Sequence, residues 1–207
     1  MKTEIEKILS PYDDSTVRDL IRAFFQENEA ARIYVDEAQK RDWPVVLDHI
    51  TVRCLDVDRR AQEFLKLGYE DRNELVEYPD QGWWAKVYRR KGYPALFIDQ
   101  AYADARGEQS ILPGWVNKFG DRVLHHVAVR VDDIEVAVDV LNKRGVEFSG
   151  KIVGAPGTRL RQIFSAAEVR EGMAFSVLEL AERKGYEGFY PEQADSLMQS
   201  STKKKSR

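Results

Sequence analysis

The chain has 207 residues, of which 43% are hydrophobic and 11% aromatic, so it can bury at least one sizeable core. Its formal net charge is only -3 and its many charged residues are mixed in sign, which argues against a nucleic-acid or anionic-membrane partner. A single cysteine excludes an intrachain disulfide, and no apolar run is typical of a signal peptide or a membrane span, so we expect a cytoplasmic protein.

Residues 1–44 are predicted to be a helical segment. Thr16-Val17-Arg18-Asp19 matches a helix capping box, and the apolar residues that follow it have helical spacing. We expect a break near Asn28. Trp43-Pro44 ends the segment, because a residue before proline is disfavoured in a helix. No chemistry is visible in this segment, and we expect it to cover a sheet.

Residues 45–207 are predicted to form a single catalytic domain of two similar modules, 45–102 and 123–185. The first contains a strand at 45–54, a helix at 59–67 and strands at 83–90 and 95–102. The second contains a strand at 123–131, a helix at 134–144 and strands at 146–153, 160–166 and 173–180. We interpret each half as a β-α-β-β-β unit. The connection between them, which contains Pro113-Gly114-Trp115, is expected to be irregular, and residues 202–207 to be a basic disordered tail.

One short sequence motif occurs in both halves. Leu47-Asp48-His49-Ile50-Thr51-Val52-Arg53 returns as Leu124-His125-His126-Val127-Ala128-Val129-Arg130. Because side chains alternate along a strand, each copy places a His and an Arg on one face and apolar residues on the other. A single histidine is usually a surface residue, but two at matching register favour a shared metal centre. His125 is expected on the opposite face, in a packing or supporting role.

A carboxylate can complete this centre. Glu179 lies in the apolar strand Phe175-Ser176-Val177-Leu178-Glu179-Leu180, where a lone charge is costly unless it is paired or bound to metal. Two His and one acid are the ligand set of non-haem Fe(II) sites. Glu182 competes, but we expect the strand to run into solvent there. Asp99, which we place at the position matching Glu179 in the first half, could be a fourth ligand, a supporting acid or a surface residue.

Arg53 is the candidate catalytic and substrate-binding residue outside the ligand set. It shares the face of His49 and lies about 13 Å further along the strand, at about 3.3 Å per residue. Its guanidinium can fold back towards the cavity and bind a substrate carboxylate with two hydrogen bonds. For Arg130, its counterpart in the second copy, a salt bridge with one of the many acids is the preferred interpretation.

Three stretches resemble a known family. They are residues 48–53 with the following helix and Leu67-Gly68-Tyr69, residues 115–120 leading into His126-Val127-Ala128-Val129, and residues 186–195 with Met198-Gln199-Ser200-Ser201. Together they span roughly residues 44–202. They resemble the vicinal oxygen chelate superfamily, and within it the 2-oxoadipate dioxygenase/decarboxylase family, also called hydroxyglutarate synthase. This chain is shorter than the family's larger members.

The resemblance implies an α+β fold in which two βαβββ modules form a curved mixed sheet, a half-barrel that serves as a metal cup. It implies Fe(II) bound by His49, His126 and Glu179, with Zn, Ni or Mn as alternative metals. The turn that holds Phe189 and Glu192 would close over the substrate. The implied activity is oxidative decarboxylation and hydroxylation of a 2-oxo acid such as 2-oxoadipate, with O₂ as the second substrate. A homodimer is one option for the assembly.

Two other functions stay open because one fold can host many chemistries. The first is a Zn- or Ni-dependent lyase or isomerase of the glyoxalase kind, which a fourth ligand at Asp99 would favour. The second is a non-catalytic protein that binds a small molecule, in which the two histidines would be a relic.

Overall fold

The computed structural model describes residues 2–200, which form an eight-stranded sheet covered by helices. The N-terminal helices are α1 (Lys2–Leu9), α2 (Ser15–Glu27) and α3 (Glu29–Arg41). The first module contains β1 (Val46–Arg53), α4 (Val57–Lys66), β2 (Glu70–Tyr78), β3 (Trp83–Arg89) and β4 (Ala95–Ala101). The second contains β5 (Leu124–Arg130), α6 (Ile134–Asn142), β6 (Phe148–Val153), β7 (Leu160–Ser165) and β10 (Val177–Arg183). Helix α7 (Pro191–Ser200) follows β10.

The sheet is symmetric about the pair β1 and β5. Its strands lie in the order β2-β3-β4-β1-β5-β10-β7-β6. β1 pairs antiparallel with β5, while β4 runs parallel to β1 and β10 runs parallel to β5. Each half of the order is therefore the mirror of the other. The predicted α+β fold of two βαβββ modules with an N-terminal helical segment is confirmed, and the sheet stays open between its edge strands β2 and β6.

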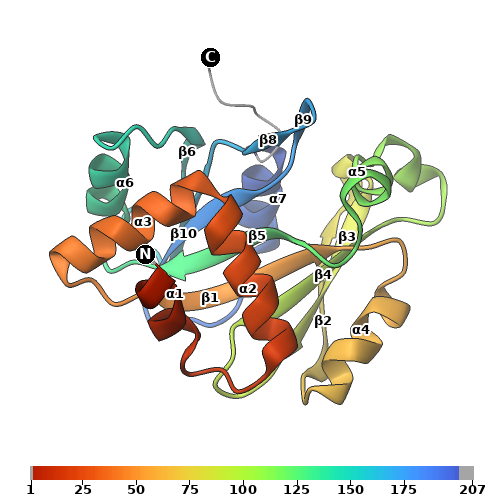
Figure 1. The fold of residues 1–207 in the computed structure, drawn as a ribbon. Helices are drawn as coiled ribbons and strands as arrows, with labels where there is room; N and C mark the ends of the chain where they lie inside the picture. Colours follow the sequence, from red (N-terminus) through yellow and green to blue (C-terminus); the bar gives the residue numbers. More distant parts are fainter. Residues whose placement is uncertain (1, 201–207) are drawn as a thin grey trace.

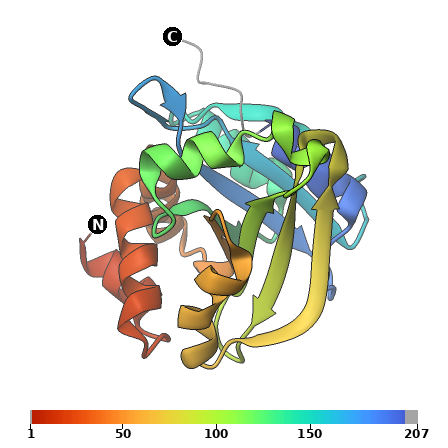
Figure 2. The ribbon, with the colours of Figure 1, turned by 90° about the vertical axis from the view of Figure 1, so that its right-hand side faces the viewer.

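The N-terminal helices cover one face of this sheet (Figure 1), as expected. Ile50 and Val52 of β1 and Val127 and Val129 of β5 are buried in the same apolar cluster as residues of α1, α2 and α3. When the molecule is turned by 90°, these helices lie to the left of the strands (Figure 2). His49 in β1 and His126 in β5 alternate with these apolar residues, so their side chains lie on the opposite face of the sheet.

Asn28 makes the predicted break between two helices. It ends α2 and begins α3: its backbone N–H donates to the Phe24 carbonyl, and its side-chain oxygen accepts from the Ala31 N–H. Its side-chain amide also donates to Ser176 Oγ at 3.1 Å. The predicted capping box is wrong, because α2 already begins before Thr16, where the Asp14 carboxylate caps the helix.

The connection between the modules and the strand expected at 173–180 also differ from the prediction. The connection expected to be irregular contains η2 (Ala105–Gln109) and α5 (Leu112–Phe119), with Pro113 in the first turn of α5. The strand expected at 173–180 begins only at Val177, because Met173–Ala174 (β9) pairs instead with Val169–Arg170 (β8). The remaining element, η1, spans Pro79–Gln81. No helix among residues 2–200 is long and apolar enough to cross a membrane. The predicted tail, 202–207, lies outside the described residues.

Candidate metal centre

Two β-bulges shape the junction between β1 and β5. In β1, Asp48 and His49 together oppose Ala128, so Asp48 is the extra residue. In β5, His125 is the extra residue, because His126 pairs with Thr51 and Leu124 pairs with Val52. A bulge interrupts the alternation of side chains and redirects the bulged residue. The residue before each repeated histidine therefore lies beside that histidine, which simple alternation does not predict.

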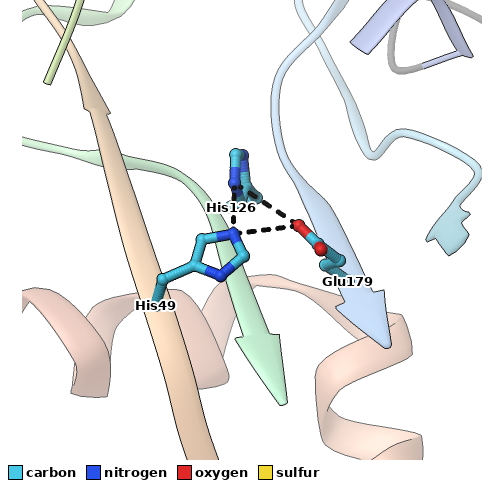
Figure 3. A group of neighbouring side chains, drawn as sticks. All are labelled: His49, His126 and Glu179. Atoms are coloured by element: carbon cyan, nitrogen blue, oxygen red, sulfur yellow. Dashed lines mark hydrogen bonds and ion pairs between the residues drawn. The ribbon is translucent and has the colours of Figure 1, made fainter. Parts of the chain in front are cut away.

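Three predicted ligands converge on the polar face of the sheet (Figure 3). His49 Nε2 lies 3.1 Å from Glu179 Oε2 and 3.2 Å from His126 Nε2. His126 Nε2 lies 3.6 Å from the same Glu179 oxygen. The three side chains are at most 6% exposed, and their ligand atoms all lie within 4.8 Å of one another. The structure thus brings together three groups that are 53 to 130 residues apart in sequence, counted from 126 to 179 and from 49 to 179.

The donor set fits a divalent cation. An ion about 2.1 Å from each donor needs donors about 3.0 Å apart in octahedral and about 3.4 Å apart in tetrahedral geometry. The observed distances of 3.1 and 3.2 Å lie within that range, and 3.6 Å lies 0.2 Å above it. Two imidazoles and one carboxylate on one side of an ion leave its other coordination positions for substrate and water. Among the described residues, this is the group that could hold a metal ion.

Each ligand is oriented by a neighbour. Asp48 Oδ2 lies 2.8 Å from His49 Nδ1, and His125 Nδ1 lies 3.0 Å from His126 Nδ1. With Nδ1 engaged in this way, Nε2 of each ligand is directed into the cluster. On the third ligand, Gln162 Nε2 donates to Glu179 Oε1 at 2.5 Å, which leaves Oε2 for the ion. Such supporting contacts fix the ligand's orientation and strengthen metal binding.

Asp48 is the centre of a buried ionic network. Arg183 donates to both of its oxygens, at 2.5 and 2.8 Å, and Arg130 Nε donates at 2.8 Å. Burial raises the pKa of Asp48, but hydrogen bonds with His49 and Arg183 outweigh that effect and hold it well below its usual range. The carboxylate therefore stays charged and keeps its contact with His49.

The two ligand histidines differ in their affinity for protons. Burial lowers the pKa of His49, but the charges of Glu179 and Asp48 outweigh it and raise the pKa to about 9. Burial and the nearby charges of His49 and Arg53 hold the pKa of His126 well below its usual range. A cation that binds the cluster must displace the His49 proton, whereas His126 is already a neutral donor.

The cluster lies in the wall of a small cavity closed by α7. The cavity has a volume of about 20 Å³, roughly the space of one water molecule. Its wall combines the three ligands with aromatic, polar and apolar side chains: His49, Thr51, Tyr78, Trp83, Phe97, Asp99, His126, Gln162, Phe164, Glu179, Ala194, Leu197 and Met198. The last two residues are buried on α7. The helix must move, or the cavity must widen, before an organic molecule can enter.

Asp99 does not occupy the position predicted for it. His49 pairs with Ala95 and His126 with Val177, so the register makes Phe97 the counterpart of Glu179. Asp99 lies two residues further along β4, about 6.6 Å from that position. It lines the cavity but lies outside the ligand group, so its predicted match to Glu179 is wrong.

The Asp99 carboxyl is nevertheless unusual. It is buried, and its Oδ2 has no hydrogen-bond partner among the described residues. Burial raises its pKa to about 7, against the opposing charges of Arg53 and His49. The group thus presents an acid with a near-neutral pKa to the cavity.

Arg53 and Glu192 do not line the cavity. The Arg53 side chain is buried, with its guanidinium carbon 5.2 Å from the ring centre of Trp115. Trp115 belongs to α5, a helix that the sequence analysis did not predict. Among the described residues, the buried Arg53 Nε has no hydrogen-bond partner, and the charge of Arg53 helps to lower the pKa of His126. Glu192 is exposed in the first turn of α7. Phe189, in contrast, packs against a ligand, with its ring 5.3 Å from that of His49.

Several supporting residues were missed or misjudged from sequence. Glu182 was expected near solvent, yet it is buried, where it accepts from the Ile134 N–H and pairs with Arg161. Gln162 was not singled out, although an amide directly before the apolar pair Ile163-Phe164 of β7 was a visible signal. Asp48 was visible as the residue before His49, but its role depends on a bulge that the pattern alone does not indicate.

No protein-family model and no curated protein matches this sequence. Solved structures do match. A mutant of 4-hydroxymandelate synthase from Streptomyces coelicolor is 19% identical with a TM-score of 0.64, over 77% of this chain and 55% of the synthase. A protein from Shewanella frigidimarina NCIMB 400 is 17% identical with a TM-score of 0.67, over 90% of this chain and 98% of that one. A protein described as a glyoxalase superfamily member, from Ralstonia eutropha JMP134, is 14% identical with a TM-score of 0.64, over 91% and 99%.

At these identities the likeness concerns the fold. The chain has the fold of the vicinal oxygen chelate and glyoxalase proteins, and it spans about half the length of the synthase. The symmetric strand order and the site at the β1–β5 junction are observed in this structure itself and do not depend on the comparison. The activity named for each of these structures is a property of that protein.

Proposed function

We propose that the chain is an Fe(II)-dependent dioxygenase that decarboxylates and hydroxylates a 2-oxo acid resembling 2-oxoadipate. The observation that carries the proposal is the set of two imidazoles and one carboxylate 3.1–3.6 Å apart. The counterpart of the third ligand in the other half is Phe97, which cannot bind a metal. Three protein ligands leave the positions that a chelating 2-oxo acid and O₂ both require.

In this proposal Fe(II), when bound, supplies the site at which the 2-oxo acid and O₂ meet and exchange electrons. The protein orients the metal ligands and excludes water from the site. Asp48 and Gln162 hold His49 and Glu179 in one orientation. The rings of Phe97, Phe164 and Phe189 pack around the two ligand histidines, at centroid distances of 5.0 to 5.3 Å. These rings exclude water from the reacting groups.

A lyase or isomerase that uses Zn or Ni is the second candidate, and Asp99 is the observation that favours it. Its unpartnered Oδ2 lies in the cavity wall, and its pKa is raised by burial to about 7. Such a group can take a proton from a carbon next to a metal-bound carbonyl and return it. A protein of the glyoxalase superfamily shares the fold, at 14% identity.

Anaerobic loading with Fe(II), followed by oxygen-uptake assays with a panel of 2-oxo acids, tests the first candidate. We expect uptake with stoichiometric CO₂ release, abolished in Glu179→Gln. Glu182→Gln is the matched control: it changes another buried carboxylate of the same strand, one that bonds to Ile134 and Arg161 instead. The control should lose stability while it keeps iron and activity.

Three other outcomes would redirect the proposal. Turnover of a thiol adduct or racemisation under Zn²⁺ or Ni²⁺, without oxygen uptake, supports the lyase or isomerase. Loss of that turnover in Asp99→Asn, with metal retained, would then identify the proton-transferring acid. Ligand affinity that is unchanged in His49→Ala, with no turnover under any metal, supports a binding protein.

A further inference from the structure

A second cavity lies on the helix-covered face of the sheet. Its volume is about 310 Å³, within the range of about 300–1,000 Å³ that is usual for small-molecule sites. It lies between α2 and α4, which are neighbours in Figure 2, and the residues that join α5 to β5 close one side. Val52 of β1 forms part of its wall. Because Val52 and His49 point to opposite faces of the sheet, the sheet itself separates this cavity from the metal cluster.

A buried arginine of α4 lines this cavity. The Arg60 side chain is only 7% exposed, yet much of its guanidinium lacks a partner. Its Nη2 pairs with Glu63, its Nη1 lies 3.8 Å from Asp121 Oδ1, beyond hydrogen-bond distance, and its buried Nε has no partner in the described part of the chain. Burial lowers the pKa of Arg60, against the charge of Asp121. A buried cation with unmet donors favours a further carboxylate in the cavity.

A second guanidinium lies beside the first. Arg122 Nη2 is 4.0 Å from the same Glu63 oxygen that pairs with Arg60, and its charge helps to lower the pKa of Arg60. The Arg122 side chain is 78% exposed, so a contact this long and this open to water holds it loosely. It can therefore turn over the cavity and join Arg60 on one anion.

The acids that line the cavity differ in how far they are engaged. Glu63 pairs with Arg60, and Asp19 pairs with Arg22 of its own helix. Asp121 has a side chain that is 49% exposed, and its one ion pair within residues 2–200 is the 3.8 Å approach to Arg60. Asp121 is therefore the carboxylate most available to a ligand's ammonium group. Because acids outnumber arginines in the wall, a phosphate or another multiply charged anion is disfavoured.

The rest of the wall is mostly apolar. Leu20 and Ala23 of α2 face Val52 and the buried ring of Phe64 across the cavity. An apolar group placed there would leave water and contact both helices. The cavity thus combines two guanidinium groups, an available carboxylate and an apolar wall, which match the two charges and the side chain of a zwitterion.

We propose that this cavity binds a free α-amino acid with an apolar side chain. Arg60, joined by Arg122, binds the carboxylate, Asp121 binds the ammonium group, and the ligand's side chain packs between α2 and α4. The N-terminal helical segment and the first module build the site together, so a bound amino acid stabilises their packing. This inference does not depend on a metal or on the proposed function.

Equilibrium dialysis of the full chain, with chelator present, tests the proposal. L-leucine, L-valine and L-phenylalanine are measured first. The one that binds best is then compared, by competition, with two analogues that lack either its ammonium group or its carboxylate; for leucine these are 4-methylpentanoate and 3-methylbutylamine. We expect the amino acid to bind about tenfold or more tightly than either analogue, because hydrogen bonds between charged groups contribute at least that factor.

Two variants separate the two charges. Arg60→Gln should abolish the preference for the amino acid over the amine, and Asp121→Asn should abolish its preference over the acid. Arg122→Gln, at an exposed position, should weaken binding of the amino acid about threefold. It keeps the carboxylate arm of the test if Arg60→Gln does not fold. Arg59→Gln, at an exposed arginine of the same helix, is the matched control and should leave every dissociation constant unchanged.

Three results would overturn the proposal. None of the three amino acids binds, or the wild type does not distinguish the amino acid from its analogues. In the third, binding is lost in His49→Ala and kept in Asp121→Asn, which would place the ligand at the metal cluster. Binding that is unchanged in His49→Ala supports the separate site and leaves the proposed function to its own test.

Discussion

Asp48 and His125 occupy equivalent bulge positions in the two repeats, and each contacts Nδ1 of the histidine that follows it. One is a charged acceptor and the other an imidazole, so the two ligand histidines receive different support. Burial lowers the pKa of both His125 and His126, whereas the carboxylates beside His49 raise its pKa to about 9. The repeat thus preserves geometry while it differentiates the two donors, which makes His49 the more electron-rich ligand.

Replacing Asp48 should weaken metal binding without removing a ligand. In Asp48→Asn, His49 keeps a polar neighbour but loses the charge, and we expect metal affinity to fall about 10- to 100-fold. Arg183, whose side chain is 4% exposed, also loses its buried counter-charge, so unfolding should become easier by about 3–5 kcal/mol. Competition with a chromophoric chelator measures the affinity, and Asp58→Asn, at an exposed acid on α4, is the control. Unchanged metal affinity would contradict a role for Asp48 in ligand support.

Metal should stabilise the wild-type fold, and the ligand variants should lose that effect. At a free metal concentration 100 times the dissociation constant, the gain is about 2.7 kcal/mol. We expect it in the wild type and not in His49→Ala, His126→Ala or Glu179→Gln. Urea unfolding with and without Zn²⁺ or Fe(II) measures it. An equal gain in all four proteins would place the metal elsewhere.

Asp99 predicts a pH-dependent stability in the metal-free protein. An unfolded aspartate has a pKa of about 3.9, whereas burial raises that of Asp99 to about 7. Below about pH 4 both states hold the proton, and Asp99 has no effect on stability. As the pH rises to 7 the unfolded chain releases its proton first, so the folded state loses stability, and above pH 7 the loss is constant.

Asp99→Asn removes this ionisation. With chelator present, we expect the variant to be more stable than the wild type at pH 8, by on the order of 2–4 kcal/mol, and similar to it at pH 4. Urea unfolding at a series of pH values gives the difference. A difference that is the same at both ends of the series would show that burial does not hold the proton on Asp99.

Asn28 should matter more than an ordinary helix cap. Its side chain caps α3 and also bonds Ser176 in the second module, at a fully buried position. Loss of a cap costs about 1 kcal/mol, and leaving a buried group unpaired adds about 1–3 kcal/mol. We expect Asn28→Ala to destabilise the protein by about 2–4 kcal/mol. Asp14→Ala, which removes only the cap of α2, should cost about 1 kcal/mol in the same thermal or urea unfolding measurement.

The repeated motif was the main sequence signal for the metal ligands and for the two central strands. Two histidines at one register, with a carboxylate in a later apolar strand, were enough to identify three side chains that the fold brings together. Apolar alternation likewise located β1 and β5, because a half-buried strand has a period of two residues. The edge strand β2, Glu70–Tyr78, was not singled out, since its largely charged sequence lacks that pattern.

What failed depended on register and on distant contacts. Asp99 was matched to Glu179 from the similarity of two apolar strands, whereas the strand pairing shows a shift of two residues. Arg53 was expected to fold back towards the cavity, but it does not line the cavity, and its guanidinium packs over Trp115 of a helix that the sequence did not reveal. The pattern of polar and apolar residues does not reveal a β-bulge. The contact of Asp48 with His49 was therefore visible only in the structure.

Because β1 and β5 each contribute one imidazole across their shared hydrogen bonds, neither module alone contains a complete set of donors. A bound cation would act as a staple between two self-similar halves, and would couple their folding as well as serve chemistry. Expressed as separate polypeptides divided within residues 103–111, the halves should reassociate more tightly when the cation is supplied.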